Sequence, residues 1–279
     1  MIVTHTAQGA RTGRNLVAGL ARCEADVRDA QRLRWRVFAC EQGARLASSP
    51  DELDRDRFDP FCEHLIVRDL DTGEVVGTYR ILPPSGACAA GGCYTEQEFD
   101  LHRIEHLRAG LVEVGRSCIH PGYRGGAVIS LLWSALARWM LQQRHEFLLG
   151  CASVPMHDGG LTATAVWRHA ARDALAPREY RVFPRVPVPM RELPAGFVPQ
   201  VPPLVKGYLR MGAWVCGEPS WDPDFNVADL PVLLPLARVE ARYARHFFGG
   251  SDAPGHGAPR AREAGTTQSV EADAAAGPA

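Results

Sequence analysis

The stretch that decides the fold is Leu111–Leu141, LVEVGRSCIHPGYRGGAVISLLWSALARWML. Its first part, Leu111–Ile119, predicts a strand, and Gly126–Gln143 predicts a long helix that is apolar almost all round. Between them lies the turn Pro121–Gly126, which ends in two glycines. A helix after such a turn presents free backbone N–H groups and the positive end of its dipole. This pattern predicts an anion site strengthened by Arg124, although glycines that merely close a tight turn would look the same.

Elements of both types surround this stretch. Ala25–Glu41 has apolar residues near helical spacing and predicts an early helix. His64–Arg68 and Val75–Leu82 predict the two strands of a hairpin. Further along, the sequence predicts a helix through Leu107 opened by a Thr95/Glu98 capping box, strands at Phe147–Val154, Ala213–Cys216 and Leu230–Leu236, and a short helix at Pro203–Met211. This order indicates one α/β (α+β) domain with a mixed, largely antiparallel sheet and helices on both faces.

The composition limits the classes of protein to which this chain can belong. The 279 residues carry a formal net charge of −1, so no whole-molecule field favours nucleic acid. Eight cysteines without a C-x-x-C pair, and no signal peptide, indicate free thiols in the cytoplasm. The composition predicts a loose N-terminus over 1–15, one domain over 16–249 and a disordered tail over 250–279.

The turn and helix resemble motif A of the GNAT superfamily, in which this loop cradles the phosphates of coenzyme A or phosphopantetheine. The resemblance implies that Tyr123, Arg124, Gly125 and Gly126 bind the donor's phosphopantetheine. It also implies a sheet that is splayed at its central strand to admit the pantetheine arm. Ile129 stands where that motif usually has a small residue, which favours a donor with one phosphodiester, such as acyl carrier protein, over coenzyme A.

A wider set of polar residues accompanies the turn: Arg34-x-x-x-Phe38, Asp56-x-x-Asp59, Arg80 and Glu113-x-x-Arg116. It is similar to the signature of the acyl-homoserine lactone autoinducer synthases, which acylate an amino acid derivative from acyl carrier protein. The tryptophan that follows the Arg/Phe pair in that family is missing here, and the rest of the chain does not follow it.

The chain more closely resembles the ornithine-acyl carrier protein N-acyltransferases, over about residues 28–248. The strings that carry the resemblance are FDPFCEHLIVRD, VVGTYRILP, YTEQEFDL, EVGRSCIHPGYR, LLGCASVP, PPLVKGYLRMGAWV and FNVADLPVLL. It implies transfer of a (3-hydroxy) fatty acyl group from acyl carrier protein to the α-amine of L-ornithine, giving lyso-ornithine lipid. No metal and no tightly bound cofactor are expected, and the amphiphilic product is compatible with peripheral contact with the inner membrane.

Amide formation from a thioester needs a base for the amine and donors for the oxyanion, but no covalent enzyme intermediate. Glu113 is the preferred base or ammonium-orienting carboxylate, and a bulge at Val114-Gly115 would bring it to the same face as Arg116. A plain surface ion pair between the two is the simpler interpretation.

The remaining candidates divide by charge. An arginine, from among Arg34, Arg80 and Arg116, would hold the substrate carboxylate. Asp56, Asp59 or Glu63 would hold the second ammonium of ornithine, although each is individually more typical of a solvated or capping position. Phe38 and Ser117 complete the predicted substrate-binding set, and Tyr123 or Tyr208 would protonate the leaving thiolate.

Three other functions compete with this one. His102-x-x-Glu105-His106 matches the H-x-x-E-H motif of a class of zinc peptidases. A coenzyme A-dependent acetyltransferase of a small amine would use the same fold. A non-catalytic protein that binds acyl carrier protein would keep the fold without the chemistry.

Overall fold

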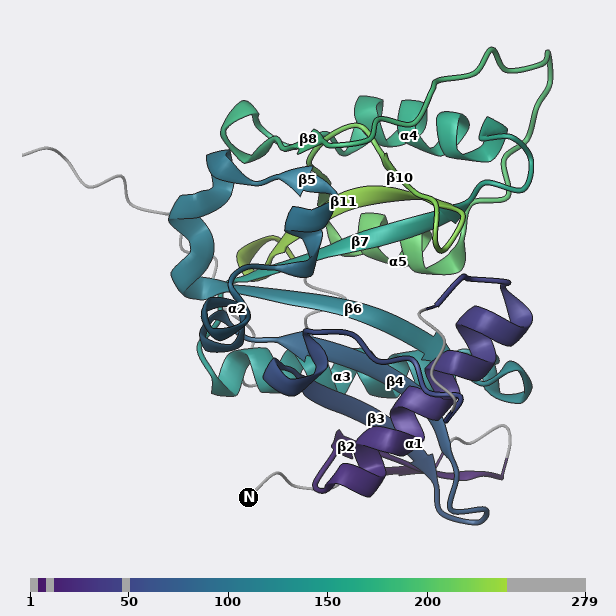
Figure 1. Ribbon diagram of the computed structural model, residues 1–279, viewed down its shortest axis with the longest axis vertical. Helices are drawn as coiled ribbons and strands as arrows, with labels where there is room; N and C mark the ends of the chain where they lie inside the picture. The colour runs from purple at the N-terminus through teal and green to yellow at the C-terminus, as the bar shows by residue number, and fades with distance from the viewer. Residues whose placement is uncertain (1–4, 9–12, 47–50, 240–279) are drawn as a thin grey trace, which may run out of the picture.

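The computed structural model describes residues 5–8, 13–46 and 51–239 (Figure 1). Within this part, nine strands form one sheet in the order β1-β2-β3-β4-β6-β7-β11-β10, with β9 also paired to β11. The strands are β1 (His5–Gln8), β2 (Asn15–Leu20), β3 (Glu63–Asp69), β4 (Val75–Leu82), β6 (Leu111–Ile119), β7 (Phe147–Pro155), β9 (Trp214–Val215), β10 (Ser220–Asp222) and β11 (Val227–Pro235). Only β6 and β7 are parallel; the other strand pairs are antiparallel. The sheet is therefore mixed and mostly antiparallel, as predicted.

Helices cover both faces of this sheet (Figure 1). They are α1 (Glu24–Trp35), which continues as wider turns over Arg36–Glu41, α2 (Pro84–Ala90), α3 (Ala127–Gln142), α4 (Leu161–Asp173) and α5 (Pro203–Met211). On β3, Ile66 packs into the cluster beneath α1, whereas Leu65 and Val67 pack into the cluster beneath α3. Because successive strand residues point to opposite faces, α1 and α3 lie on opposite sides of the hairpin β3–β4.

The close approach of α3 to the sheet depends on a glycine. A Cβ on Gly77 of β4 would come within 2.3 Å of the Val128 side chain in the first turn of α3. The missing side chain lets α3 pack directly on β4, which fixes the N-terminus of the helix next to the end of β6.

The predicted helix after Thr95 was wrong. Residues Tyr94–Gln97 form a single 3₁₀ turn capped by Cys93 and Glu96, followed by the short strand β5 (Phe99–Asp100), which pairs with β8 (Phe183–Pro184). His102–Gly110 then forms a 3₁₀ helix rather than an α-helix. Thr95 and Glu98, which were expected to cap a helix, are instead buried. The spacing matched a capping box, but these polar side chains find their partners or neighbours in the interior.

Several other elements depart from the sequence interpretation. The helices α2 and α4 and the strand β10 were not predicted. Residues 5–8, inside the segment expected to be loose, pair with β2 as β1. The predicted disordered tail over 250–279 lies outside the described residues. Among the described helices, none has the length and apolar character needed to cross a membrane.

Candidate active site

The two parallel strands at the centre of the sheet separate along their length. β6 and β7 each contain nine residues but pair only from Leu111–Phe147 to Glu113–Leu149, and then diverge (Figure 1). A cavity of about 560 Å³ lies where they part, lined by Gly115 and Ser117 from β6 and by Ser153 from β7. The splayed sheet is as predicted, and the separation exposes strand residues that would otherwise be covered by a neighbour.

A bulge in β6 directs side chains into this cavity. Thr78 pairs with Cys118 and Arg80 with Gly115, so Arg116 and Ser117 together stand opposite Tyr79 alone. The extra residue, Arg116, has a φ of 54°, in the left-handed region. The predicted bulge is confirmed, but it lies one to two residues after the expected Val114-Gly115 position.

Three arginines and three aspartates form a buried network along one wall of the cavity. Arg34 lies 2.9 Å from Asp54 and 2.7 Å from Asp59, and Arg80 lies 2.7 Å from Asp56 and 3.0 Å from Asp59. Arg116 lies 3.3 Å from both Asp54 and Asp56. Five of these six residues are among the predicted site residues, although the prediction gave them separate roles; Asp54 was not predicted. With three positive and three negative groups, the network is electrically balanced.

Each carboxylate of this network is already paired with arginine side chains. Burial would raise the pKa of Asp59, but the guanidinium groups of Arg34 and Arg80 hold that pKa well below its usual range. Asp56 pairs with Arg80 and Arg116 in the same way. Neither acid is therefore a free anion for a substrate ammonium. The third candidate, Glu63, is not among the cavity-lining residues and accepts a hydrogen bond from the Trp139 indole at 3.0 Å.

The arginines differ in what they offer to the cavity. Arg80 and Arg116 line it, whereas Arg34 is fully buried behind them. The Arg116 guanidinium lies over the ring of Phe225 at 4.7 Å and that of Tyr94 at 4.8 Å. Burial opposes its charge, but Tyr94 and the aspartates around it raise the pKa of Arg116 further. Arg116 is thus a permanent cation held between two aromatic rings at the cavity surface.

Glu113 lies at the narrow end of the cavity, where β6 and β7 are still paired. Its carboxylate accepts hydrogen bonds from the backbone N–H of Tyr94 at 2.6 Å and of Thr95 at 2.7 Å, and also from the Thr95 hydroxyl. Burial raises the pKa of Glu113, while these donors act in the opposite direction. Glu113 therefore fixes the Tyr94–Thr95 turn at the edge of the cavity. The Thr95 hydroxyl, which also lines the cavity, lies between a bound substrate and the Glu113 carboxylate. Phe38 and Ser117, also predicted, line the same cavity.

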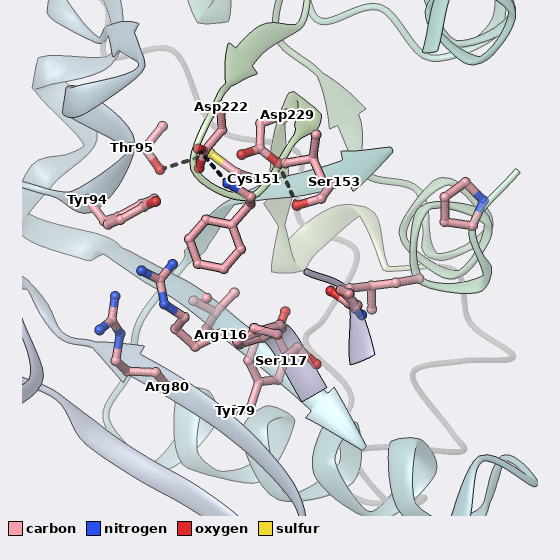
Figure 2. Close-up of a pocket in the computed structure, with 18 of the residues that line it drawn as sticks. Tyr79, Arg80, Tyr94, Thr95, Arg116, Ser117, Cys151, Ser153, Asp222 and Asp229 are labelled. Carbon is pink, nitrogen blue, oxygen red and sulfur yellow. Dashed lines mark hydrogen bonds between the residues drawn. The ribbon is translucent and has the colours of Figure 1, made fainter. Parts of the chain in front are cut away.

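The opposite wall is acidic, and sequence analysis missed it. Figure 2 shows Arg80 and Arg116 on one side of the cavity and Asp222, Asp229 and Ser153 on the other. The Ser153 hydroxyl donates to Asp229 at 2.5 Å, and the backbone N–H groups of residues 224 and 225 donate to Asp222. Two strings that carry the family resemblance, YTEQEFDL and FNVADLPVLL, contain Glu98 and Asp229. Nothing in their spacing shows that they meet.

The two candidate proton donors are placed differently. Tyr208 on α5 lines the cavity, and burial raises its pKa, so its hydroxyl stays protonated. Tyr123 lies outside the lining, and its hydroxyl donates to Asp69 at 2.8 Å while Arg14 packs over its ring. Of the two, Tyr208 is the residue that can reach a group inside the cavity.

The Gly-Gly turn lies next to the mouth of the cavity. Gly126, with a φ of 96°, precedes α3, and no side chain caps the first N–H groups of that helix. Arg124 donates to the Ile119 carbonyl and pairs with both oxygens of Glu41 at 2.5 and 2.7 Å; Glu41 itself lines the cavity. Ile129, half-buried, packs against the main core. Gly122 and Tyr123 donate their backbone N–H groups to His120, whereas among the described residues no side chain caps the first N–H groups of α3; the charge of Arg124 is already matched.

Glu41→Gln is expected to lower the KM for the acyl donor about two- to five-fold, because an exposed pair of this kind contributes up to about 1 kcal/mol and its loss frees Arg124 for the donor phosphate. Steady-state kinetics with the donor varied at fixed acceptor would measure this, and Glu105→Gln, which loses its pair with Arg108, is the matched control. An unchanged or higher donor KM would show that Arg124 does not meet the phosphate.

The H-x-x-E-H motif does not form a metal-binding face. It lies on the 3₁₀ helix His102–Gly110, where residues four apart point about 120° away from each other. The His102 ring bonds Asp100 at 2.9 Å, and Glu105 pairs with Arg108. His106 packs near the ring of Tyr180. The zinc peptidase alternative therefore lacks its ligand arrangement.

Comparison with known proteins agrees with this geometry. A family model described as an acetyltransferase (GNAT) domain matches residues 33–134, which span the hairpin, the bulged strand and the Gly-Gly turn. Among solved structures, the AHL synthase LasI aligns with a TM-score of 0.48 at 16% identity, covering 85% of this chain and 97% of that one. FeeM, an N-acyl amino acid synthase from uncultured soil microbes, aligns with a TM-score of 0.48 at 14% identity, covering 80% and 91%. The domain match identifies a GNAT acetyltransferase domain over residues 33–134, which contain the bulged strand β6 of the splayed sheet.

Curated relatives narrow the class. The L-ornithine N(alpha)-acyltransferase of Brucella abortus (strain 2308) is 34% identical over 256 residues, covering 84% of this chain and 89% of the relative. The protein of the same name from Rhodobacter capsulatus is 35% identical over 243 residues, covering 82% and 93%. The chain belongs to the L-ornithine N(alpha)-acyltransferase family.

Proposed function

We propose that this enzyme transfers a (3-hydroxy) fatty acyl group from acyl carrier protein to the α-amine of L-ornithine, giving lyso-ornithine lipid. The observation that carries the proposal is the position of Arg116: a half-buried, permanently charged guanidinium facing the cavity between the splayed strands. The names of the relatives supply the acceptor. An amphiphilic product further implies that the enzyme releases it at a membrane surface.

The guanidinium wall would bind the α-carboxylate of the amino acid. Arg116 lines the cavity, and its contacts with Asp54 and Asp56, at 3.3 Å each, use its Nε and one terminal nitrogen. Its other terminal nitrogen would donate to a further anion. Arg80 supports it from β4, although its own carboxylate pairs are shorter. Charge-assisted binding of this kind fixes the α-carbon and thereby the direction of the α-amine.

The donor would enter from the α3 side. Its phosphopantetheine phosphate would meet the free N–H groups at Gly125 and Gly126, and its pantetheine arm would follow the gap between β6 and β7. Glu41 already neutralises Arg124, so the turn offers little net positive charge. That arrangement suits one phosphodiester better than the several phosphates of coenzyme A.

The reaction would proceed by direct attack. The neutral α-amine attacks the thioester carbonyl, so that a C–N bond forms and the C–S bond breaks. The Thr95 hydroxyl, which donates to Glu113, would accept the amine proton while passing its own proton to that carboxylate. Tyr208 would protonate the leaving thiolate and then regain a proton from solvent, while Glu113 releases the proton it took from the amine. In this scheme Glu113 is the base, acting through Thr95, and Arg116 orients the substrate.

A donor and acceptor competition tests the proposal. Purified protein would be incubated with 3-hydroxyacyl–acyl carrier protein or the matching acyl-CoA, in the presence of ornithine and other amino acids, and products would be read by mass spectrometry. We expect N-acyl-ornithine from the carrier-protein thioester. Product from acyl-CoA alone would favour the coenzyme A-dependent alternative, another acceptor would change the substrate, and no product at all would support the non-catalytic alternative.

A further inference from the structure

In the part of the chain that the structure describes, the acidic wall of the cavity has no cationic side chain paired with it. Asp222 and Asp229 are buried, with 8% and 4% of their surface exposed, and Glu98 lies beside Asp229 with 9% exposed. Among the described residues, no arginine, lysine or histidine pairs with any of the three. The aspartates across the cavity are each paired with at least one arginine. Buried carboxylates without a cationic partner destabilise the folded state, so we look for a role of these acids in binding a cation.

Glu98 provides a second observation. Neither of its side-chain oxygens makes a hydrogen bond of ordinary geometry, although the residue is more than nine-tenths buried. A Glu98 oxygen, the Cys151 sulfur and an Asp229 oxygen all lie within 4.8 Å of one another, so Glu98 stands behind the lining residues Cys151 and Asp229. Burial and the two neighbouring aspartates raise the pKa of Glu98 to about 10, and burial raises that of Asp229 to about 6. Glu98 is therefore a neutral acid at neutral pH that can donate its proton to Asp229, and the negative charge of the wall belongs to the two aspartates.

The chemistry of the wall favours an ammonium over a metal ion. Burial raises the pKa of the Cys151 thiol well above its usual value, so its sulfur stays protonated and is a poor metal ligand. Without the sulfur, the available groups are the carboxyl oxygens and the Ser153 hydroxyl. Together these acceptors suit the three N–H donors of a primary ammonium.

We propose that Asp222 and Asp229, with Glu98 behind them, form the subsite for the δ-ammonium of ornithine, opposite the guanidinium wall that takes its α-carboxylate. The inference rests on the proposed function and deepens it: the two walls together select an α-amino acid with a cationic side chain. The arrangement replaces the predicted ammonium ligands Asp56 and Asp59, which the arginines already neutralise, and Glu63, which lies elsewhere.

The test compares ornithine with norvaline, which has the same carbon chain but no δ-ammonium. We expect the wild-type enzyme to prefer ornithine by about 30-fold or more in kcat/KM, the effect of a charge-assisted hydrogen bond. In the variants Asp222→Asn and Asp229→Asn this preference should collapse, with norvaline turnover changing less than about three-fold. Asp173→Asn, an exposed aspartate on α4, is the control that should keep the preference.

Folding and function can be separated in the same experiment. Because Asp229→Asn removes a buried carboxylate without changing the shape of the side chain and keeps an acceptor for the Ser153 hydroxyl, its Tm should not fall and is expected to rise. A lower Tm with equal losses for both substrates would overturn the subsite in favour of a structural role, and an unchanged preference would also overturn it. If no donor is turned over, calorimetric binding of ornithine and norvaline gives the same comparison. Wild-type acylation of both amino acids with equal efficiency would sink this inference while leaving the acyltransfer proposal standing.

Discussion

Replacing Arg34 by methionine is expected to lower the free energy of unfolding by about 3–5 kcal/mol, because it leaves a buried charge without its partner. Arg34 is fully buried and pairs with Asp54 and Asp59, which are themselves nearly inaccessible. The network of three arginines and three aspartates is neutral, so removing one arginine leaves one uncompensated negative charge. Equilibrium unfolding in urea would measure the change.

A second substitution shows whether charge balance is the cause. Asp54→Asn in the Arg34→Met background restores neutrality and should recover part of the loss, whereas independent effects would add. The control is Arg28→Met on the same helix, which breaks only an exposed pair with Glu24 and should cost less than about 0.5 kcal/mol. A loss at Arg34 no larger than at Arg28 would show that the network contributes little to stability.

Arg116→Lys is expected to reduce kcat/KM for ornithine about 100-fold while leaving the KM for the acyl donor within about two-fold. Lysine preserves the charge and therefore the balance of the network. It cannot, however, reach both Asp54 and Asp56 and still present a planar pair of donors to a substrate carboxylate. Initial rates with ornithine varied at saturating donor would measure the effect.

The matched control is Arg68→Lys. Arg68 also bridges two aspartates, Asp26 and Asp29, but it lies outside the cavity lining. Its replacement should leave both kinetic constants near the wild-type values. If Arg116→Lys instead raised the donor KM and spared ornithine, the guanidinium would contact the thioester side and the carboxylate site would have to be sought elsewhere.

The two walls of the cavity show how the enzyme distributes charge. On the β4–β6 side each aspartate is matched to an arginine, so this side is rigid and neutral before substrate arrives. On the β10–β11 side, Asp222 and Asp229 are buried and pair with no cationic side chain among the described residues, so they are available to a cationic substrate group. Preorganisation on one side and uncompensated charge on the other would let a zwitterion with an extra ammonium bind in one orientation.

Much of the architecture could be predicted from the sequence. The hairpin β3–β4, the strand β6 and the helix α3 follow from local periodicity, and the Gly-Gly turn marks where the helix begins. The splayed strands and the bulge followed from the resemblance and from the glycine in β6. These features are encoded by residues close together in the chain.

The pairing of charges was decided only by tertiary structure. Asp56 and Asp59 have the same spacing whether they face solvent, arginine or substrate, and only the packing of α1 against the sheet places Arg34 between Asp54 and Asp59. Likewise Thr95 and Glu98 matched a helix cap, yet the strands carrying Glu113 and Asp229 draw them into the cavity walls. The sequence determined which groups are available and which elements carry them. Contacts between residues far apart in the chain decide which carboxylates pair with an arginine and which do not. Local periodicity carries no information about those contacts.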